Sequence, residues 1–369
     1  MTAHLAFFGL GKRALRERAE LLSRVDHVRM VCGCDPRELA RTAFGVFDDR
    51  MKLFDAPAPV WEQQWDAAII CAPAHLRAQM ALQAVESGRH ALLTLPVALN
   101  ISQLETLRQA CAVAREKHLA LWPAQSLFFD PFWQALHARL ASKSATEQLG
   151  RIARFGQSVW IAPNHPARQE RGSLAAIAHG IDSLSFLFPD AESDPANAVQ
   201  AQEPSLRARA HSCPESHWTA DGSLARGLQF SFFAGLDAPH PTAQELQRWM
   251  IASPAATAPG ELPPPLTPPW KETLRFEGSR GQWTAWPQQG ALLWDGEAPG
   301  FSQPLPASDP AQAQMNLLKA FCSAVRMPSP RQNEFMLTAL ERSATVALEL
   351  RGLGAAQWPS ASLEWLAAA

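Results

Sequence analysis

A glycine turn between an apolar run and a helix is the feature that most constrains this chain. Residues 9–14 fit the pattern G-x-G-x-x-A, directly after the apolar run 5–8 and directly before residues with helical spacing. The first glycine permits a tight turn, the second lets a ligand approach the backbone, and the helix start offers unpaired N–H groups to an anion. The pattern predicts a strand–turn–helix unit that binds phosphate. Its binding residues are expected to be Gly9, Leu10, Gly11, Lys12 and Arg13.

An acidic residue follows this turn at the distance expected of a ribose-binding site. Asp35 closes the next apolar run, about 20 residues downstream. A carboxylate there accepts hydrogen bonds from ribose hydroxyls and repels a 2′-phosphate, so the sequence favours NAD(H) over NADP(H). The basic side chain of Arg37 nearby works against that preference. In the alternative interpretation, Gly9 and Gly11 form an ordinary strand-to-helix turn and Asp35 caps a helix.

Short apolar runs alternate with amphipathic segments up to about Ala141, which is the pattern of parallel strands joined by crossover helices. Six strands are expected, at residues 5–8, 28–32, 52–54, 67–71, 90–93 and 120–122. Helices are expected at residues 12–23, 76–87 and 102–116. The sequence therefore predicts a doubly wound α/β domain of the Rossmann type over residues 1–125.

The pattern changes after Gly150, where longer strands and turn signals follow. Strands are expected at residues 151–160, 197–202, 227–233, 272–276 and 282–286, with turns such as Asp221-Gly222 and residues 278–281 between them. Helices are expected at residues 173–188, 311–325 and 334–352, and the proline-rich run 253–269 is expected to be a surface loop. This predicts an α+β domain over residues 126–369 with a large, mainly antiparallel open sheet. The last helices can pack back onto the first domain.

Composition excludes several classes of protein. A chain of 369 residues suits two domains, because single cores stop growing near about 250 residues. A net charge of −2 without a basic patch argues against a nucleic-acid partner, and no apolar run approaches the roughly 20 residues that span a bilayer. We therefore expect a cytoplasmic protein with no membrane partner. Six scattered cysteines without a C-x-x-C pair predict neither a metal site nor a disulfide framework, and the absence of tyrosine excludes a tyrosine acid.

Several further motifs follow one another along the chain. They are the apolar run and turn at 68–73, the segment 81–92, the Phe-Asp-Pro run 129–131, the Leu-Gly-Arg-Ile run 149–152, the His-Gly-Ile-Asp run 179–182 and the hairpin 276–281. In this order they resemble the landmarks of the Gfo/Idh/MocA (glucose–fructose oxidoreductase/inositol dehydrogenase) family over nearly the whole chain. The resemblance implies a nicotinamide cofactor on the first domain and a small-molecule substrate. It also implies a homodimer or homotetramer formed through the second sheet.

The resemblance also implies roles for particular residues. Those at the cofactor are Ala72, Pro73, His75, Leu95 and Pro96, in addition to the glycine turn and Asp35. Those lining the substrate pocket are Phe128, Trp160 and Ala175. The catalytic candidates are His179 and Asp182, one helical turn apart.

The expected reaction site departs from the family pattern. The Glu-Lys-Pro triplet of sugar-oxidising relatives here reads Thr94-Leu95-Pro96, and Leu95 can neither donate nor accept a proton. Phe128 and Ala175 likewise stand where an arginine and an aspartate are usual, and Arg77 aligns with a histidine. The resulting pocket is more apolar than a polyol site, because each substrate hydroxyl needs a polar partner.

Two interpretations stay open. In the first, the chain is an oxidoreductase that moves a hydride to or from an apolar, aromatic or imine-like molecule, with His179 or solvent supplying the proton. In the second, it is a catalytically silent member that binds the dinucleotide as an accessory or scaffold subunit. His179 lies on a half-apolar helix and is equally compatible with a packing role.

Overall fold

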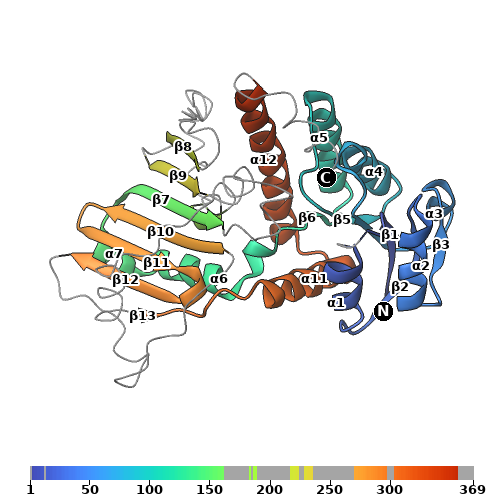
Figure 1. The fold of residues 1–369 in the computed structure, drawn as a ribbon, viewed down its shortest axis with the longest axis horizontal. Helices are drawn as coiled ribbons and strands as arrows, with labels where there is room; N and C mark the ends of the chain where they lie inside the picture. Colours follow the sequence, from blue (N-terminus) through green and yellow to red (C-terminus); the bar gives the residue numbers. More distant parts are fainter. Residues whose placement is uncertain are drawn as a thin grey trace. The chain divides into compact units, whose positions relative to one another are not determined.

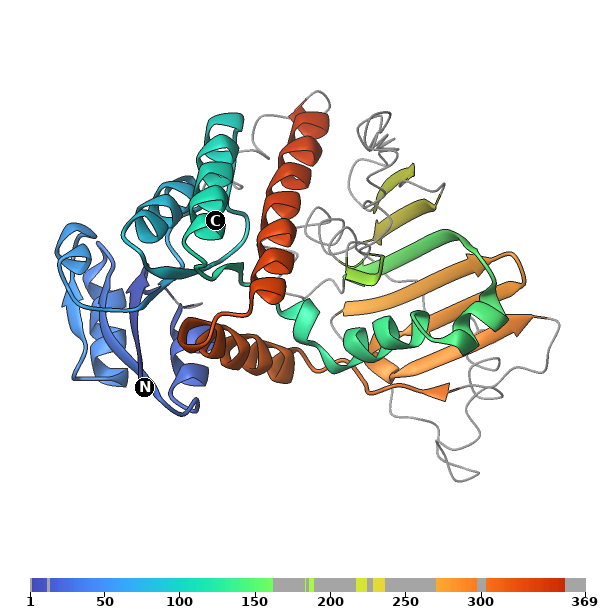
Figure 2. The ribbon, with the colours of Figure 1, turned by 180° about the vertical axis from the view of Figure 1, so that it is seen from behind.

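The fold is known from a computed structural model (Figures 1 and 2). The structure describes residues 2–11, 14–161, 183, 186–188, 217–223, 228–235, 270–296 and 303–355. The chain forms two compact units. The first comprises Met1–Phe129 and Pro310–Ala369, and the second comprises Asp130–Asp309. The second unit thus ends before the two closing helices, which belong to the first.

The first unit contains a six-stranded parallel sheet in the order β3-β2-β1-β4-β5-β6. Its strands are β1 (Ala3–Phe8), β2 (Val28–Cys34), β3 (Lys52–Phe54), β4 (Ala67–Ile70), β5 (His90–Leu93) and β6 (Leu121–Pro123). This is the Rossmann strand order, and it confirms the predicted doubly wound domain with its six strands. The order reverses between β1 and β4, so the carboxyl ends of these two strands flank the crevice where such sheets bind ligands.

The central strands β1 and β4 are apolar over most of their length because both of their faces are covered. Neighbouring side chains of β1 point to opposite faces, and Phe7 and Phe8 are both fully buried. The ring of Phe7 contacts Phe44 of α2 (Glu38–Phe47) with centroids 5.5 Å apart. The ring of Phe8 contacts Trp61 of α3 (Ala58–Trp61) at 4.6 Å. The strand therefore lies inside a core with two sides.

The two long helices between the strands of the first unit lie close to the predicted positions, and a third differs. They are α4 (Ala74–Glu86) and α5 (Ile101–Glu116). The helix expected at 12–23 is instead a π-helical segment η1 (Ala14–Ala19) followed by the short α1 (Glu20–Leu22). Single π turns are typical of functional sites, where the backbone departs from the regular ladder. The α5 amino terminus is capped by Asn100, whose Oδ1 accepts from Gln103 N at 2.9 Å.

Two closing helices complete the first unit. They are α11 (Pro310–Arg326) and α12 (Pro330–Ala355), and α12 lies beside α5 in both views (Figures 1 and 2). The indole Nε1 of Trp122 donates to Asn333 Oδ1 of α12 at 2.9 Å, inside the core. The Trp122 ring also stacks on Phe129 of the 3₁₀ turn η2 (Ser126–Phe129) and meets the edge of Phe321 of α11. The last strand of the sheet is thereby joined to both helices.

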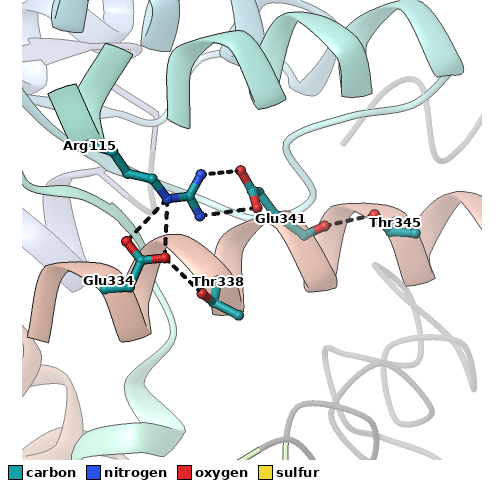
Figure 3. A network of polar contacts seen from close by, with 5 residues as sticks. All are labelled: Arg115, Glu334, Thr338, Glu341 and Thr345. Carbon is teal, nitrogen blue, oxygen red and sulfur yellow. Dashed lines mark hydrogen bonds and ion pairs between the residues drawn. The ribbon is translucent and has the colours of Figure 1, made fainter. Parts of the chain in front are cut away.

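A network of charged side chains also joins α12 to α5 (Figure 3). Arg115 Nε donates to both carboxylate oxygens of Glu334 at 3.1 Å, and its Nη1 and Nη2 donate to Glu341 at 2.9 and 3.3 Å. Glu334 and Glu341 are seven residues apart, so they lie two turns apart on one face of α12. The hydrogen bond to Glu341 is the largest cause of the raised pKa of Arg115.

The second unit contains a seven-stranded sheet in the order β13-β12-β11-β10-β7-β9-β8. Its strands are β7 (Ile152–Ile161), β8 (His217–Ser223), β9 (Gln229–Gly235), β10 (Trp270–Gly278), β11 (Gly281–Trp286), β12 (Ala291–Gly296) and β13 (Gln303–Pro304). Neighbouring strands are antiparallel except β7 and β9, which are parallel. The predicted antiparallel sheet is confirmed. The helices α6 (Pro131–Leu140) and α7 (Lys143–Leu149) and the 3₁₀ turn η5 (Pro287–Gln289) belong to the same unit.

Two sequence predictions for this unit differ in outcome. The hairpin turn expected between residues 278 and 281 is present, joining β10 to β11. The turn expected at Asp221-Gly222 was wrong: both residues lie inside β8, opposite Ser231 and Phe230 of β9. The pairing with a neighbouring strand outweighs the local turn preference of this dipeptide. The strand expected at 197–202 and the loop at 253–269 fall outside the described residues, as does most of the helix expected at 173–188.

Among the described residues, no helix combines the length and the hydropathy that crossing a bilayer requires.

Candidate cofactor site

The turn after β1 holds the first site residue, Gly9, in a position that excludes a side chain. Its φ is +88°, a left-handed conformation that favours glycine. A Cβ at Gly9 would lie 2.8 Å from backbone atoms of Cys71 and Ala72, just after β4. The N–H of Gly9 donates to Cys34 O of β2 at 2.8 Å. The turn is thus packed directly onto the carboxyl ends of both neighbouring strands.

Gly11 has much more space than Gly9. Among the described residues, the atom that a Cβ at Gly11 would approach is Arg37 Nη2, at 3.3 Å. That atom is the end of a flexible side chain and not backbone. Lys12 and Arg13, which the sequence placed at the same site, fall outside the described residues.

Asp35 lies at the carboxyl end of β2 with its carboxylate buried. Its Oδ2 accepts from Leu10 N and from Arg37 Nη2, both at 2.9 Å. Its Oδ1 accepts from Arg37 N and Nε, also at 2.9 Å. Burial alone would raise the pKa of Asp35, but the hydrogen bonds from Arg37 and Leu10 outweigh it and lower the pKa below its usual value. The carboxylate is therefore charged, and it ties the glycine turn to the end of β2.

Arg77 joins the two loops that follow β4 and β5. It is buried, its Nε donates to Ala72 O at 2.7 Å, and its Nη1 donates to Pro96 O at 2.6 Å. The peptide bond between Leu95 and Pro96 is cis, and both residues are half-buried. The loops that carry Ala72, Leu95 and Pro96 are thus held together by one guanidinium.

The sequence missed this role, although a signal for it existed. Arg77 occupies the apolar stripe of α4 formed by Ala74, Ala78 and Ala81, all of which are buried. A charge in such a stripe needs buried acceptors, which backbone carbonyls at a sheet edge supply. His75, predicted at the cofactor, is exposed, and its carbonyl accepts from Gln103 Nε2 at 3.3 Å. Pro73, at the start of α4, is exposed as well.

The residue that replaces the family glutamate is turned inward. Thr94 is buried, and its Oγ1 donates to Ile70 O of β4 at 3.1 Å. Leu95 contacts the apolar core of the first unit. Neither side chain can therefore exchange a proton at this edge of the sheet.

The residues predicted for the substrate side are only partly described. His179, Asp182 and Ala175 fall outside the described residues, and Trp160 is placed only as part of β7. Phe128 is buried, and its ring meets the edge of the Phe335 ring on α12 at 5.3 Å. The contact that the structure gives Phe128 is thus packing within the first unit, and its place in a pocket stays a prediction.

Asp130 begins α6 in the second unit. Its Oδ1 accepts from Phe132 N at 2.9 Å and its Oδ2 accepts from Ser308 Oγ at 2.8 Å. Burial raises the pKa of this carboxyl, and the hydrogen bond from Ser308 offsets only part of that rise. These contacts identify Asp130 as a helix cap.

A buried polar cluster on the second sheet was not predicted. Gln157 Nε2 of β7 donates to Glu272 Oε1 of β10 and lies 3.4 Å from Ser183 Oγ. The backbone N–H of Glu272 donates to Gln288 Oε1 at 3.2 Å. Glu272 lies on the same face of β10 as the buried Leu274 and Phe276, because side chains two residues apart in a strand point the same way. Its inward direction could therefore have been predicted from the sequence.

The residues of the first unit fit a dinucleotide. The glycine turn lies beside the reversal of strand order, and Gly11 leaves room for a pyrophosphate. The N–H groups of Gly9 and Leu10 are used within the fold, so these two residues would shape the turn while Gly11 would face the phosphates. The β2 end would meet the adenine ribose, and Ala72, Leu95 and Pro96 would flank the nicotinamide. In the described part of the chain, no group of three His, Cys, Asp or Glu residues could hold a metal ion.

Comparisons with known proteins agree with this arrangement. The model of the Gfo/Idh/MocA oxidoreductase family, with its NAD-binding Rossmann fold, matches residues 3–125. An uncharacterized oxidoreductase of Synechocystis sp. (strain PCC 6803) is 32% identical over 143 residues. That match covers 36% of this chain and 36% of the relative, so it spans about a third of each protein.

Solved structures resemble the chain over nearly its whole length. KijD10, a 3-ketoreductase from Actinomadura kijaniata in complex with NADP and TDP-benzene, has a TM-score of 0.64 at 17% identity. The similarity covers 94% of this chain and 96% of that one. A dehydrogenase from Chromobacterium violaceum has a TM-score of 0.66 at 15% identity and covers 96% of both chains. At these identities the likeness establishes the two-sheet fold.

Proposed function

We propose that the chain is an NAD(P)-dependent oxidoreductase of the Gfo/Idh/MocA family, whose model matches residues 3–125. The observation that carries the proposal is the glycine turn at the reversal of strand order, where Gly9 contacts the end of β4 and Leu10 is tied to Asp35. The structurally similar KijD10 is described in complex with NADP, which fits a dinucleotide at this position. A bound nicotinamide supplies or accepts the hydride, and the protein positions it.

We propose an apolar, aromatic or imine-like small molecule as the substrate, in preference to a simple sugar. Thr94 donates its hydroxyl to Ile70 O and Leu95 is aliphatic, so neither can take a proton from a substrate alcohol. Reducing an imine or conjugated bond makes weaker demands on a side-chain base. His179 would supply the proton, with Asp182 to orient it, and Trp160 and Ala175 would line the pocket.

The first test is titration of the protein with NADPH and NADH, followed by fluorescence or calorimetry. We expect wild-type protein to bind a dinucleotide and Gly11→Trp to weaken binding of both forms by roughly a hundredfold or more, because the indole fills the space that the pyrophosphate needs. The variant should keep its fold, since among the described residues a Cβ at Gly11 meets the flexible Arg37 side chain and no backbone. Wild-type protein that is folded but binds neither form would contradict the proposal.

A second candidate is a dinucleotide-binding accessory protein without catalysis, which the loss of proton-transfer groups at Thr94 and Leu95 favours. The two candidates separate in a screen of apolar carbonyls and imines with the bound cofactor. Turnover that falls in His179→Gln supports the enzyme, whereas tight binding without any turnover supports the accessory protein.

We also propose that the chain forms a homodimer or homotetramer through the sheet of the second unit. One face of this sheet is buried within the unit at Phe155 and Phe276, while Arg154 and Arg275 are exposed on the other. Light scattering should give twice or four times the mass of the chain, and Arg275→Glu should shift the population toward the monomer. A wild-type monomer at micromolar concentration would contradict this assembly.

A further inference from the structure

The Asp35 carboxylate has no acceptor capacity left for a ribose. An ionised carboxylate offers about four lone-pair sites. All of them are used here, because Oδ1 accepts from Arg37 N and Nε, and Oδ2 accepts from Leu10 N and Arg37 Nη2. The basis for preferring NAD(H) in the sequence was a carboxylate available to the ribose hydroxyls. For Asp35 to accept from a ribose hydroxyl, its hydrogen bonds with the Arg37 side chain would first have to break.

The same bonds fix the Arg37 guanidinium at the glycine turn. The bidentate contact with Asp35 holds the planar group, whose Nη2 lies 3.3 Å from the place of a Cβ on Gly11. The side chain is nonetheless 68% exposed, so its outer edge faces solvent. Its Nη1 takes part in none of the bonds to Asp35 and remains available as a donor. A guanidinium held this way matches the bidentate geometry of a phosphate.

A second arginine is anchored at the same strand end. Arg41 Nη1 donates to Asp35 O at 2.7 Å and to Pro36 O at 3.0 Å. Asp35 pairs with Arg37, whereas Arg41 is held by backbone carbonyls, which carry no charge. The hydrogen bonds that Arg37 donates to Asp35 raise the pKa of Arg37, which keeps that group charged at any working pH.

We propose that Arg37 selects the cofactor by binding the 2′-phosphate of NADP(H), with Asp35 as its positioning residue, so that the protein binds NADP(H) more tightly than NAD(H). The proposal rests on the proposed function, because it concerns the dinucleotide of that site. A 2′-phosphate takes up the exposed N–H groups of Arg37 and leaves the Asp35–Arg37 pair intact. A 2′-hydroxyl offers no charge to these arginines and finds no acceptor on Asp35.

The chain supplies a matched control for Arg37. Arg50 repeats part of the Arg37 arrangement two residues after an aspartate: Arg50 N and Nε donate to Asp48 Oδ1 at 3.1 and 3.2 Å. Its side chain is 75% exposed. Arg50 precedes β3, so it lies at the amino ends of the parallel strands, opposite the glycine turn. Removing it deletes a similar arginine–aspartate pair from the same unit, away from the glycine turn.

The experiment is a titration of wild type, Arg37→Ala and Arg50→Ala with NADPH and NADH, read by calorimetry. We expect wild type to prefer NADPH and Arg37→Ala to weaken NADPH binding by roughly ten- to a hundredfold, the effect of losing charged hydrogen bonds. NADH should bind Arg37→Ala at least as well as wild type, because Asp35 becomes free to accept from the ribose. Arg50→Ala should change neither affinity.

The ratio of the two affinities is a readout that a general loss of structure would not move. An equal loss for both cofactors in Arg37→Ala, or no change for either, overturns the role of Arg37. Wild-type binding of NADH in preference to NADPH overturns the selectivity while leaving the proposed function in place. Binding of neither by folded wild-type protein overturns the proposed function itself.

Discussion

Gly9→Ala is expected to destabilise the first unit by about 2–5 kcal/mol, through two separate causes. The left-handed φ of +88° costs an alanine roughly 1–2 kcal/mol. Forcing a Cβ to within 2.8 Å of the Cys71 and Ala72 backbone adds an overpacking cost of about 1–3 kcal/mol, because neither neighbour is a flexible side chain. Urea unfolding followed by tryptophan fluorescence measures the change, and dinucleotide binding should be lost with it.

Gly88 separates these two causes. It also has a left-handed φ, +75°, but a Cβ built there meets nothing within 4 Å. Gly88→Ala therefore measures the conformational cost alone, about 1 kcal/mol. The excess loss in Gly9→Ala then reports the close approach of the turn to the end of β4. Equal destabilisation by the two substitutions would show that the contact with Cys71 and Ala72 is absent.

The fold was predictable because its strongest signals are local. The central strands β1 and β4 are continuous apolar runs, since helices cover both faces of a parallel sheet. The glycine turn lies within a few residues of the strand that precedes it. The seven-stranded sheet was predictable mainly at its glycine hairpin, whereas β8 was missed because its Asp221-Gly222 pair has a turn composition.

The site was less predictable, because its decisive contacts are made by residues whose partners the sequence does not indicate. Asp35 was identified by its distance from the glycine turn in the sequence. The sequence pattern cannot show that the Arg37 guanidinium donates to both oxygens of its carboxylate. Arg77 binds carbonyls that belong to two different loops, and only the folded sheet edge brings these together. The proposed catalytic pair His179 and Asp182 lies outside the described residues and remains a prediction from the resemblance.

The docking of the closing helix α12 was likewise not predictable from the sequence, because it depends on a buried hydrogen bond between Trp122 and Asn333, 211 positions apart. Trp122 is fully buried and Asn333 is 6% exposed, so neither polar group can turn to water if its partner is removed. Asn333→Leu should therefore cost about 2–3 kcal/mol, close to the penalty for a buried donor left unpaired. The loss should be seen as a lower urea midpoint for the first unit.

A double-mutant cycle distinguishes this penalty from a simple loss of packing. Trp122→Phe removes the N–H donor, leaves the Asn333 amide oxygen unpaired and opens a small cavity, so we expect a loss of comparable size. When both partners are replaced by apolar groups, no orphaned polar atom remains, and the pair can be close to neutral. The double variant should then be more stable than the sum of the two single losses predicts by about 1–2 kcal/mol. Strict additivity would mean that Trp122 Nε1 and Asn333 Oδ1 are not hydrogen-bonded, and that the other contacts of α12 with the first unit hold it in place.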